Sequence, residues 1–263
     1  MRPPTRNRGS RDSRRPPIHR LILWNIDLTL VDVGQVSRDA CADAFREVTG
    51  RPLVRLPLTA GRTDSEVFFD ALAVNAPELD GTENTQAMLA AYNEALATAF
   101  GARRDQIATK GRLLPGVREA LAAVAALPGV VQTVLTGTIE PNARTKLTAF
   151  GLDKLFDLTI GGYGSEPYPK GTLLRVTRSR AGDARGVAFG EEATVYIGDS
   201  PRDVEAARVG GARAVAVAGG RSTPAELAAS GADAVLADLT DAPLVVRTID
   251  ALTSGADAHG QAC

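Results

Sequence analysis

Polar side chains able to do chemistry follow several separate runs of strand-forming residues. The stretch LILWNIDLTLVD, residues 21–32, ends one such run with Asn25, Asp27 and Thr29. The corresponding residues after two other runs are Thr136, Gly137 and Thr138, and then Asp199, Ser200 and Asp203, while the segment near 170 supplies Lys170. Carboxylates beside small residues suit a hard divalent cation, and hydroxyl groups with a lysine suit phosphate oxygens. Together these residue types predict metal-assisted phosphoryl transfer.

Each of these residues, taken singly, also has a purely structural explanation. Asp199 could cap the helix that follows it, Thr136 could start a turn, and Lys170 could be a solvated surface charge. The functional interpretation rests on their order in the chain, since the sets at 25–29, 136–138 and 199–203 each come directly after a strand signal and Lys170 directly precedes a helical pattern.

Strands and helices alternate through most of the chain. Strand patterns cover 21–26, 130–135, 193–198 and 213–219, and each is followed by a helical pattern. This alternation predicts an α/β fold, a Rossmann-like parallel sheet with helices on both faces. Binding sites in such sheets collect at the C-terminal ends of the strands, where the polar residues above would meet.

The interval 37–110 breaks this alternation, because it contains helical patterns only. Three helices inserted after the first strand predict an all-helical cap above the strand ends. The predicted organisation is therefore a core formed by 19–36 and 111–252, with the cap at 37–110. Residues 1–18, rich in Arg and Pro, are expected to form a disordered basic tail, and residues 253–263 a flexible one.

Composition narrows the classes of partner. The formal net charge of -1 for 263 residues argues against a nucleic-acid partner, and no apolar run reaches the roughly 18 residues that span a bilayer. Cys41 and Cys263 are too few for a disulfide framework, so a cytoplasmic location is expected. The oligomeric state is left open.

Three motifs resemble those of a known family. The stretches NIDLTLVD, LTGT and VYIGDSPRDVEAAR are similar to the first, second and fourth motifs of the haloacid dehalogenase superfamily. The resemblance covers roughly residues 20–240 and is strongest to the phosphoglycolate phosphatase-like branch, whose helical cap follows the first motif. It implies a Mg²⁺-dependent phosphatase that works through an aspartyl-phosphate and acts on a small phosphorylated metabolite.

The resemblance also implies a role for each matching residue. Asn25 stands at the position of the nucleophile, and Asp27 at that of the general acid and base. The phosphoryl oxygens would be held by Thr136, Gly137 and Thr138, with Lys170 neutralising their charge. Mg²⁺ would lie between the side chain of Asn25, the main-chain carbonyl of Asp27 and Asp199, with Asp203 acting through water or as a support. Arg62 would reach the remote group of the substrate.

The sequence departs from the family pattern at several of these positions. An amide at Asn25 is a poor nucleophile, so this chain is expected to be nearly inactive. Either Asn25 replaces a natural Asp, or the chain is a natural pseudo-phosphatase that binds its ligand without cleaving it. A sugar-phosphate mutase is a further alternative. Leu28 stands where the family has Gly, and the lysine of the third motif is Lys170, with Lys146 as its rival.

Overall fold

A computed structural model describes residues 19–254 of the chain. The tail predicted over 1–18 lies outside these residues, as does the tail predicted over 253–263 apart from its first two residues. The final helix, α10, extends to Thr253.

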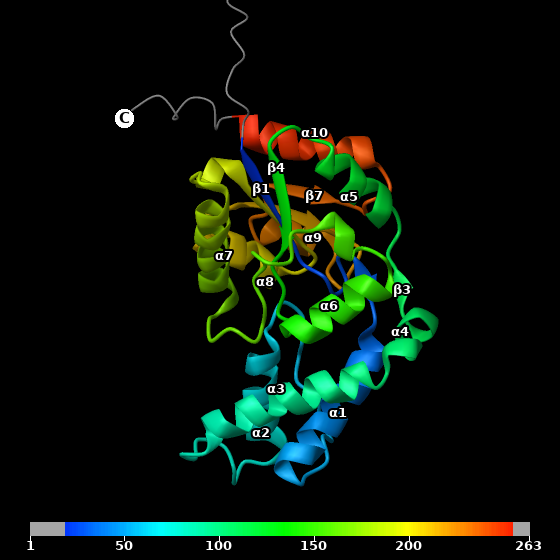
Figure 1. Ribbon diagram of the computed structural model, residues 1–263, viewed down its shortest axis with the longest axis vertical. Coiled ribbons are helices and arrows are strands. Elements are labelled where there is room, and N and C mark those ends of the chain that lie inside the picture. Colours follow the sequence, from blue (N-terminus) through cyan, green and yellow to red (C-terminus); the bar gives the residue numbers. More distant parts are fainter. Residues whose placement is uncertain (1–18, 255–263) are drawn as a thin grey trace, which may run out of the picture.

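The core is a parallel five-stranded sheet in the order β4-β1-β5-β6-β7 (Figure 1). Its strands are β1 (Arg20–Trp24), β4 (Val130–Val134), β5 (Thr194–Gly198), β6 (Arg213–Val217) and β7 (Ala234–Leu236). The helices that connect or follow them are α5 (Val117–Ala125), α6 (Glu140–Ala149), α7 (Lys170–Arg185), α8 (Pro201–Gly210), α9 (Pro224–Ala229) and α10 (Ala242–Thr253), with short 3₁₀ turns at Asp153–Leu155 and Glu191–Ala193.

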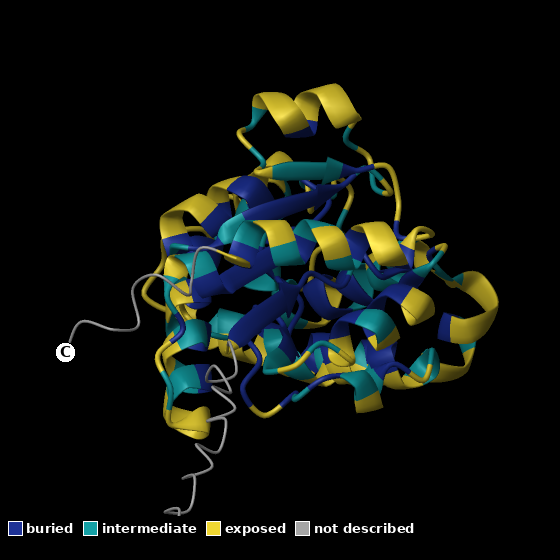
Figure 2. Cartoon of the chain, turned by 90° about the horizontal axis from the view of Figure 1, so that it is seen from above, coloured by how far each residue is buried: buried dark blue, intermediate teal, exposed yellow. Residues whose placement is uncertain are grey.

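Strand β1 shows why helices cover both faces of the sheet. All five of its residues are buried, and successive side chains point to opposite faces. Ile22 and Trp24 pack in one apolar cluster with residues of α5 and α10, whereas Leu21 and Leu23 pack in another with residues of α7 and α8. Figure 2 shows the strands buried between helices that are exposed on their outer sides. The predicted α/β fold is therefore confirmed.

The inserted segment forms a helical cap on one side of the sheet (Figure 1). Its helices are α1 (Gly34–Thr49), α2 (Asp64–Asn75), α3 (Thr85–Gly101) and α4 (Arg104–Lys110). Helix α1 packs along α3, and an aromatic cluster joins them to α2: the rings of Phe68 and Tyr92 stack with centroids 4.5 Å apart, and Phe45 meets Phe68 edge to face. These rings hold the cap helices together as a unit.

The chain enters and leaves the cap at adjacent places. Strand β2 (Val31–Asp32) pairs antiparallel with β3 (Arg112–Leu113), so the outgoing and returning segments lie side by side. Neither two-residue strand was predicted, and α4 is a fourth inserted helix where the sequence pattern indicated three.

Candidate active site

The polar residues predicted from the sequence gather at the C-terminal end of β1. In the sheet, β1 has β4 on one side and β5 on the other. The connections from these strands therefore run to opposite sides of the C-terminal end of β1. This divergence is where open α/β sheets bind their ligands. Asn25 follows β1, Thr136 follows β4 and Asp199 follows β5, while Lys170 begins α7 and Asp203 lies in the first turn of α8.

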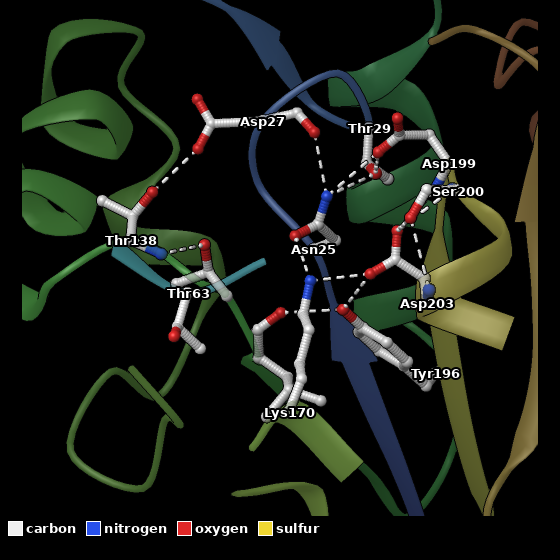
Figure 3. A network of polar contacts seen from close by, with 12 residues as sticks. Asn25, Asp27, Thr29, Thr63, Thr138, Lys170, Tyr196, Asp199, Ser200 and Asp203 are labelled. Atoms are coloured by element: carbon white, nitrogen blue, oxygen red, sulfur yellow. Dashed lines mark hydrogen bonds and ion pairs between the residues drawn. The ribbon is translucent and has the colours of Figure 1, made fainter. Parts of the chain in front are cut away.

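Asn25 lies at the centre of a hydrogen-bonded network (Figure 3). Its buried side-chain Nδ2 lies 2.8 Å from the carbonyl oxygen of Asp27, 3.1 Å from Oγ1 of Thr29 and 3.0 Å from Oδ1 of Asp199. An amide has two hydrogens, so three oxygens share two donors. On its other side, Oδ1 of Asn25 accepts from Nζ of Lys170 at 3.2 Å, which fixes the orientation of the amide.

Lys170 is buried and paired with Asp203. Its Nζ lies 2.6 Å from Oδ1 of Asp203, which also accepts from the hydroxyl of Tyr196 at 2.9 Å. Burial alone would raise the pKa of Asp203, but the charge of Lys170 and the hydrogen bonds from Lys170, Ser200 and Tyr196 hold this pKa below its ordinary value. The carboxylate of Asp203 is therefore ionised and neutralised in place.

Asp203 also supports the start of α8. Ser200 is the N-cap of this helix, and its hydroxyl accepts from the Asp203 N–H while Oδ2 of Asp203 accepts from the Ser200 N–H at 3.1 Å. Asp199 is thus not the capping residue, and its side chain is free to face Asn25 and Thr29. Burial, with the nearby charge of Asp203, raises the pKa of Asp199 above its ordinary value. An opposite charge beside Asp199 would favour its ionised form.

Asp27 faces a different partner. Both of its carboxylate oxygens accept from Nζ of Lys146 on α6, at 2.8 and 2.7 Å, and Oδ2 also accepts from Oγ1 of Thr138 at 2.8 Å. The two candidate lysines therefore occupy distinct places: Lys170 contacts Asn25, whereas Lys146 contacts Asp27.

The loop after β4 carries the predicted phosphate-binding residues. The hydroxyl of buried Thr136 accepts from the N–H of Thr138 at 3.1 Å. Gly137 touches the cap, because a Cβ there would collide with the main-chain carbonyl of Arg62. The guanidinium of Arg62 forms an ion pair with Asp70 on α2. The structure thus places the backbone of Arg62 beside the strand ends and ties its charged group within the cap.

The donor set can be compared with what a divalent cation requires. The Asp27 carbonyl, the Thr29 hydroxyl and the Asp199 carboxylate are hard oxygen donors converging on one point, as Mg²⁺ prefers. In this chain that point faces the NH₂ group of Asn25. Among residues 19–254, no group of three or more His, Cys, Asp and Glu side chains is arranged to hold a metal ion. These oxygens are of the type that Mg²⁺ binds. A carboxylate at position 25 would add one more oxygen donor and one negative charge to the set.

Three residues near this site were not predicted in the positions that they occupy. Tyr196 lies inside β5, where a strand pattern reads as core, yet its hydroxyl donates to Asp203. Lys146 appeared only as a rival to Lys170, because its position in a helix shows nothing of what the helix faces. Asp64 of the cap accepts from the Ile139 N–H at 2.9 Å, and burial raises its pKa to about 6. These three side chains reach the site through tertiary packing, which the local sequence pattern does not show.

Comparison with known families identifies the class of protein. A model of the haloacid dehalogenase-like hydrolases matches residues 22–208, and the chain belongs to this family. A search of curated proteins found no match.

Solved structures share its architecture. A hydrolase from Pseudomonas syringae has a TM-score of 0.63 at 20% identity, covering 88% of this chain and 99% of that chain. A predicted phosphoglycolate phosphatase from Haemophilus somnus has a TM-score of 0.56 at 24% identity, covering 87% and 98%. CbbY from Rhodobacter sphaeroides, in complex with phosphate, has a TM-score of 0.58 at 19% identity, covering 85% and 96%. At these identities the likeness establishes the fold. No helix between residues 19 and 254 has both the length and the apolar character to cross a membrane.

Proposed function

We propose that the protein is built as a Mg²⁺-dependent phosphatase for a small phosphorylated metabolite, and that Asn25 in place of the nucleophilic Asp leaves this chain nearly inactive. The observation that carries the proposal is the position of Asn25. Its Oδ1 meets Lys170, and its Nδ2 meets the Asp27 carbonyl and Asp199. An Asp at this position would have one oxygen beside Lys170 and the other directed at the oxygens that suit a cation.

The reaction would proceed in two displacement steps. In the first, a carboxylate oxygen at position 25 attacks phosphorus, the bond from phosphorus to the leaving oxygen breaks, and Asp27 gives its proton to that oxygen. In the second, water attacks the phosphorus of the aspartyl-phosphate while Asp27 takes a proton from it. The bond to residue 25 then breaks, which releases inorganic phosphate and restores the carboxylate.

The neighbouring residues would hold the phosphoryl group. Thr136 and the main chain at Gly137 and Thr138 lie after β4 as candidate contacts to the phosphoryl oxygens, and Lys170 offers a fixed positive charge. Mg²⁺, held by residue 25, the Asp27 carbonyl and Asp199, with Asp203 as a support, would supply positive charge to the phosphoryl oxygens.

A small substrate is supported by the contacts between cap and core. The Asp64 N–H donates to the carbonyl of Gly137 at 2.7 Å, and the hydroxyl of Ser65 donates to the carbonyl of Gly164 at 3.0 Å. A cap bonded to the rim of the site leaves little room for a folded macromolecule. Arg62 is proposed to contact the remote group of the substrate after exchanging its partner Asp70.

Phosphate release tests the proposal. This chain and its Asn25→Asp variant are assayed with Mg²⁺ against an aryl phosphate and a panel of sugar and small-acid phosphates. We expect the Asn25→Asp variant to exceed the parent chain by about 10⁴- to 10⁶-fold in turnover, the usual effect of losing a nucleophile. No phosphate release from either protein would contradict the hydrolase.

Thermal unfolding with and without Mg²⁺ gives a second measurement that needs no turnover. A cation at 100 times its Kd stabilises the native state by about 2.7 kcal/mol. We expect Mg²⁺ to stabilise the Asn25→Asp variant and to have little effect on this chain, because the amide hydrogens of Asn25 face the donor oxygens. An equal effect on both proteins would place the bound ion elsewhere.

A binding protein without hydrolase activity is the second candidate. It is favoured by the hydrogen-bonding of Asn25, whose two amide hydrogens are shared among the three surrounding oxygens without a metal. Such a protein would bind phosphorylated ligands and stay inactive after Asn25→Asp.

A sugar-phosphate mutase is the other alternative. It would return the phosphoryl group to the substrate rather than to water, and product analysis of the active variant distinguishes the two outcomes.

A further inference from the structure

Lys146 is a buried cation to which the proposed reaction assigns no role. Its side chain is 4% exposed, whereas that of Asp27, its partner, is 39% exposed. A buried ammonium group requires compensation by charge and hydrogen bonds. Lys146 has both, and all three of its hydrogen bonds go to residues of the candidate site.

The donors of Lys146 are fully used. Its three N–H groups have three acceptors within reach: Oδ1 and Oδ2 of Asp27, at 2.8 and 2.7 Å, and Oγ1 of Thr138, at 2.9 Å. The hydroxyl of Thr138 in turn donates to Oδ2 of Asp27 at 2.8 Å. Lys146, Thr138 and Asp27 therefore form a closed triangle, in which each side chain restricts the rotation of the other two.

The triangle lies where the core meets the cap. Lys146 belongs to α6, and its Nζ lies 5.5 Å from the centroid of the Phe100 ring on α3. A cation near an aromatic ring in a desolvated place is attracted to it. The cap thus contributes to holding the ammonium group beside the carboxylate of Asp27.

We propose that Lys146 is a positioning residue, which together with Thr138 holds the carboxylate of Asp27 in the orientation that proton transfer to the leaving oxygen requires. This inference rests on the proposed function. It gives the two lysines separate tasks: Lys170 serves residue 25 and the phosphoryl group, and Lys146 serves the proton-transfer group.

The dependence of rate on the leaving group tests this role. In the Asn25→Asp background, Lys146→Met is compared with its parent by kcat/KM on p-nitrophenyl phosphate and on an alkyl phosphate. An alkoxide needs a proton to leave and nitrophenolate does not, so we expect a loss of about 10²-fold or more for the alkyl phosphate and less than ~10-fold for the aryl phosphate. An equal loss on both substrates, or none, overturns the proposal.

Matched variants separate positioning from general damage. Lys146→Arg keeps two donors for the carboxylate and should recover part of the alkyl phosphate activity. Lys154→Met removes an exposed lysine and should leave kcat/KM unchanged for both substrates. If Lys146→Met does not fold, Thr138→Val removes the bridging hydroxyl at nearly constant shape and should show the same selective loss; its absence overturns the proposal equally.

A measurement on the Asn25 chain itself keeps this inference distinct from the proposed function. A crystal structure of its Lys146→Met variant needs no turnover and should show the Asp27 carboxylate rotated from its present orientation, since the Thr138 hydroxyl alone holds only one of its oxygens. If Asp27 keeps its orientation, the inference fails whatever the Asn25→Asp variant catalyses. If Asp27 rotates while the Asn25→Asp variant hydrolyses no phosphate, the failure lies with the proposed function.

Discussion

Leu28, one residue past Asp27, has a left-handed backbone with φ of 60°. Its N–H donates to the carbonyl of Val31 at 2.8 Å, which closes the turn that leads from β1 to β2. The left-handed region costs an L-residue about 1–2 kcal/mol, because Cβ approaches the following carbonyl oxygen. A Gly would meet no such cost, and this explains the Gly of the family pattern in physical terms.

The strain at Leu28 can be tested by comparing two variants that lose the same side-chain packing. Leu28→Ala and Leu28→Gly both remove the isobutyl group, but only Ala keeps Cβ in the left-handed backbone. We expect the Gly variant to be more stable than the Ala variant by about 1 kcal/mol, the reverse of their order at ordinary positions. Urea unfolding at unchanged m-value measures the difference. An Ala variant equal to or above the Gly variant would show that the turn relaxes.

Helix α2 belongs to the cap but begins on the core. Thr63 and Glu66 form its capping box, so the first turn is fixed by its own side chains. Asp64, the first helical residue, then bonds to the loop after β4 through its N–H and through Oδ2. Burial, the largest effect, raises the pKa of Asp64 to about 6 against the attraction of Lys146. The first turn of α2 therefore holds both a capping box and a titratable carboxyl group, that of Asp64.

The sign of the pH effect at Asp64 follows from that pKa. The folded chain binds this proton more tightly than the unfolded chain, so the contribution of Asp64 to stability is full below about pH 4 and is lost as the pH rises through about 6. Asp64→Asn keeps an acceptor for the Ile139 N–H and removes the titration. From pH 4 to 7, the free energy of unfolding of the parent should therefore fall relative to the variant by about 2 kcal/mol. Parallel pH profiles for the two proteins would refute this.

How far the sequence predicts the elements depends on their length. Strand β5 is a continuous run of buried residues, and helix α7 is long enough to show a helical pattern, so the sheet and its covering helices follow from the sequence. Strands β2 and β3, with two residues each, carry no period. The strand-end residues could be predicted because a parallel sheet gathers its C-terminal ends at one edge. The partners of Lys146 could not, because they depend on how α6 is rotated against the sheet.

The cap and the core make backbone contact across the site. Gly137 on the core lies against the carbonyl of Arg62 on the cap, and Gly61 lies against Ser200 and Arg202, with no room for a Cβ at either glycine. These two glycines let the cap loop approach the strand ends. The molecule as described is thus in a closed arrangement.

Gly137→Ala should open this contact. A methyl group there cannot coexist with the Arg62 carbonyl, so residues 59–66 should move away from the core. We expect faster hydrogen exchange in this segment and, in the Asn25→Asp background, a lower kcat/KM. Gly101→Ala is the control, because an added Cβ at Gly101 meets no atom within 4 Å. Unchanged exchange in 59–66 of the Gly137→Ala variant would mean that the backbone adjusts without opening.

The place of β1 in the sheet has a consequence for biosynthesis. This strand precedes the other four strands of the sheet in the chain, yet Arg20 pairs with Val130 and Leu21 pairs with Thr194, both of which are synthesised after the entire cap. As the chain leaves the ribosome, the apolar side chains of β1 stay unpaired until β4 and β5 have been synthesised. The cap helices, in contrast, can pack against one another as soon as they emerge. Contacts at such sequence separation slow folding and prolong the exposure of unpaired strands. The nascent chain is therefore most exposed to aggregation between the emergence of β1 and that of β5.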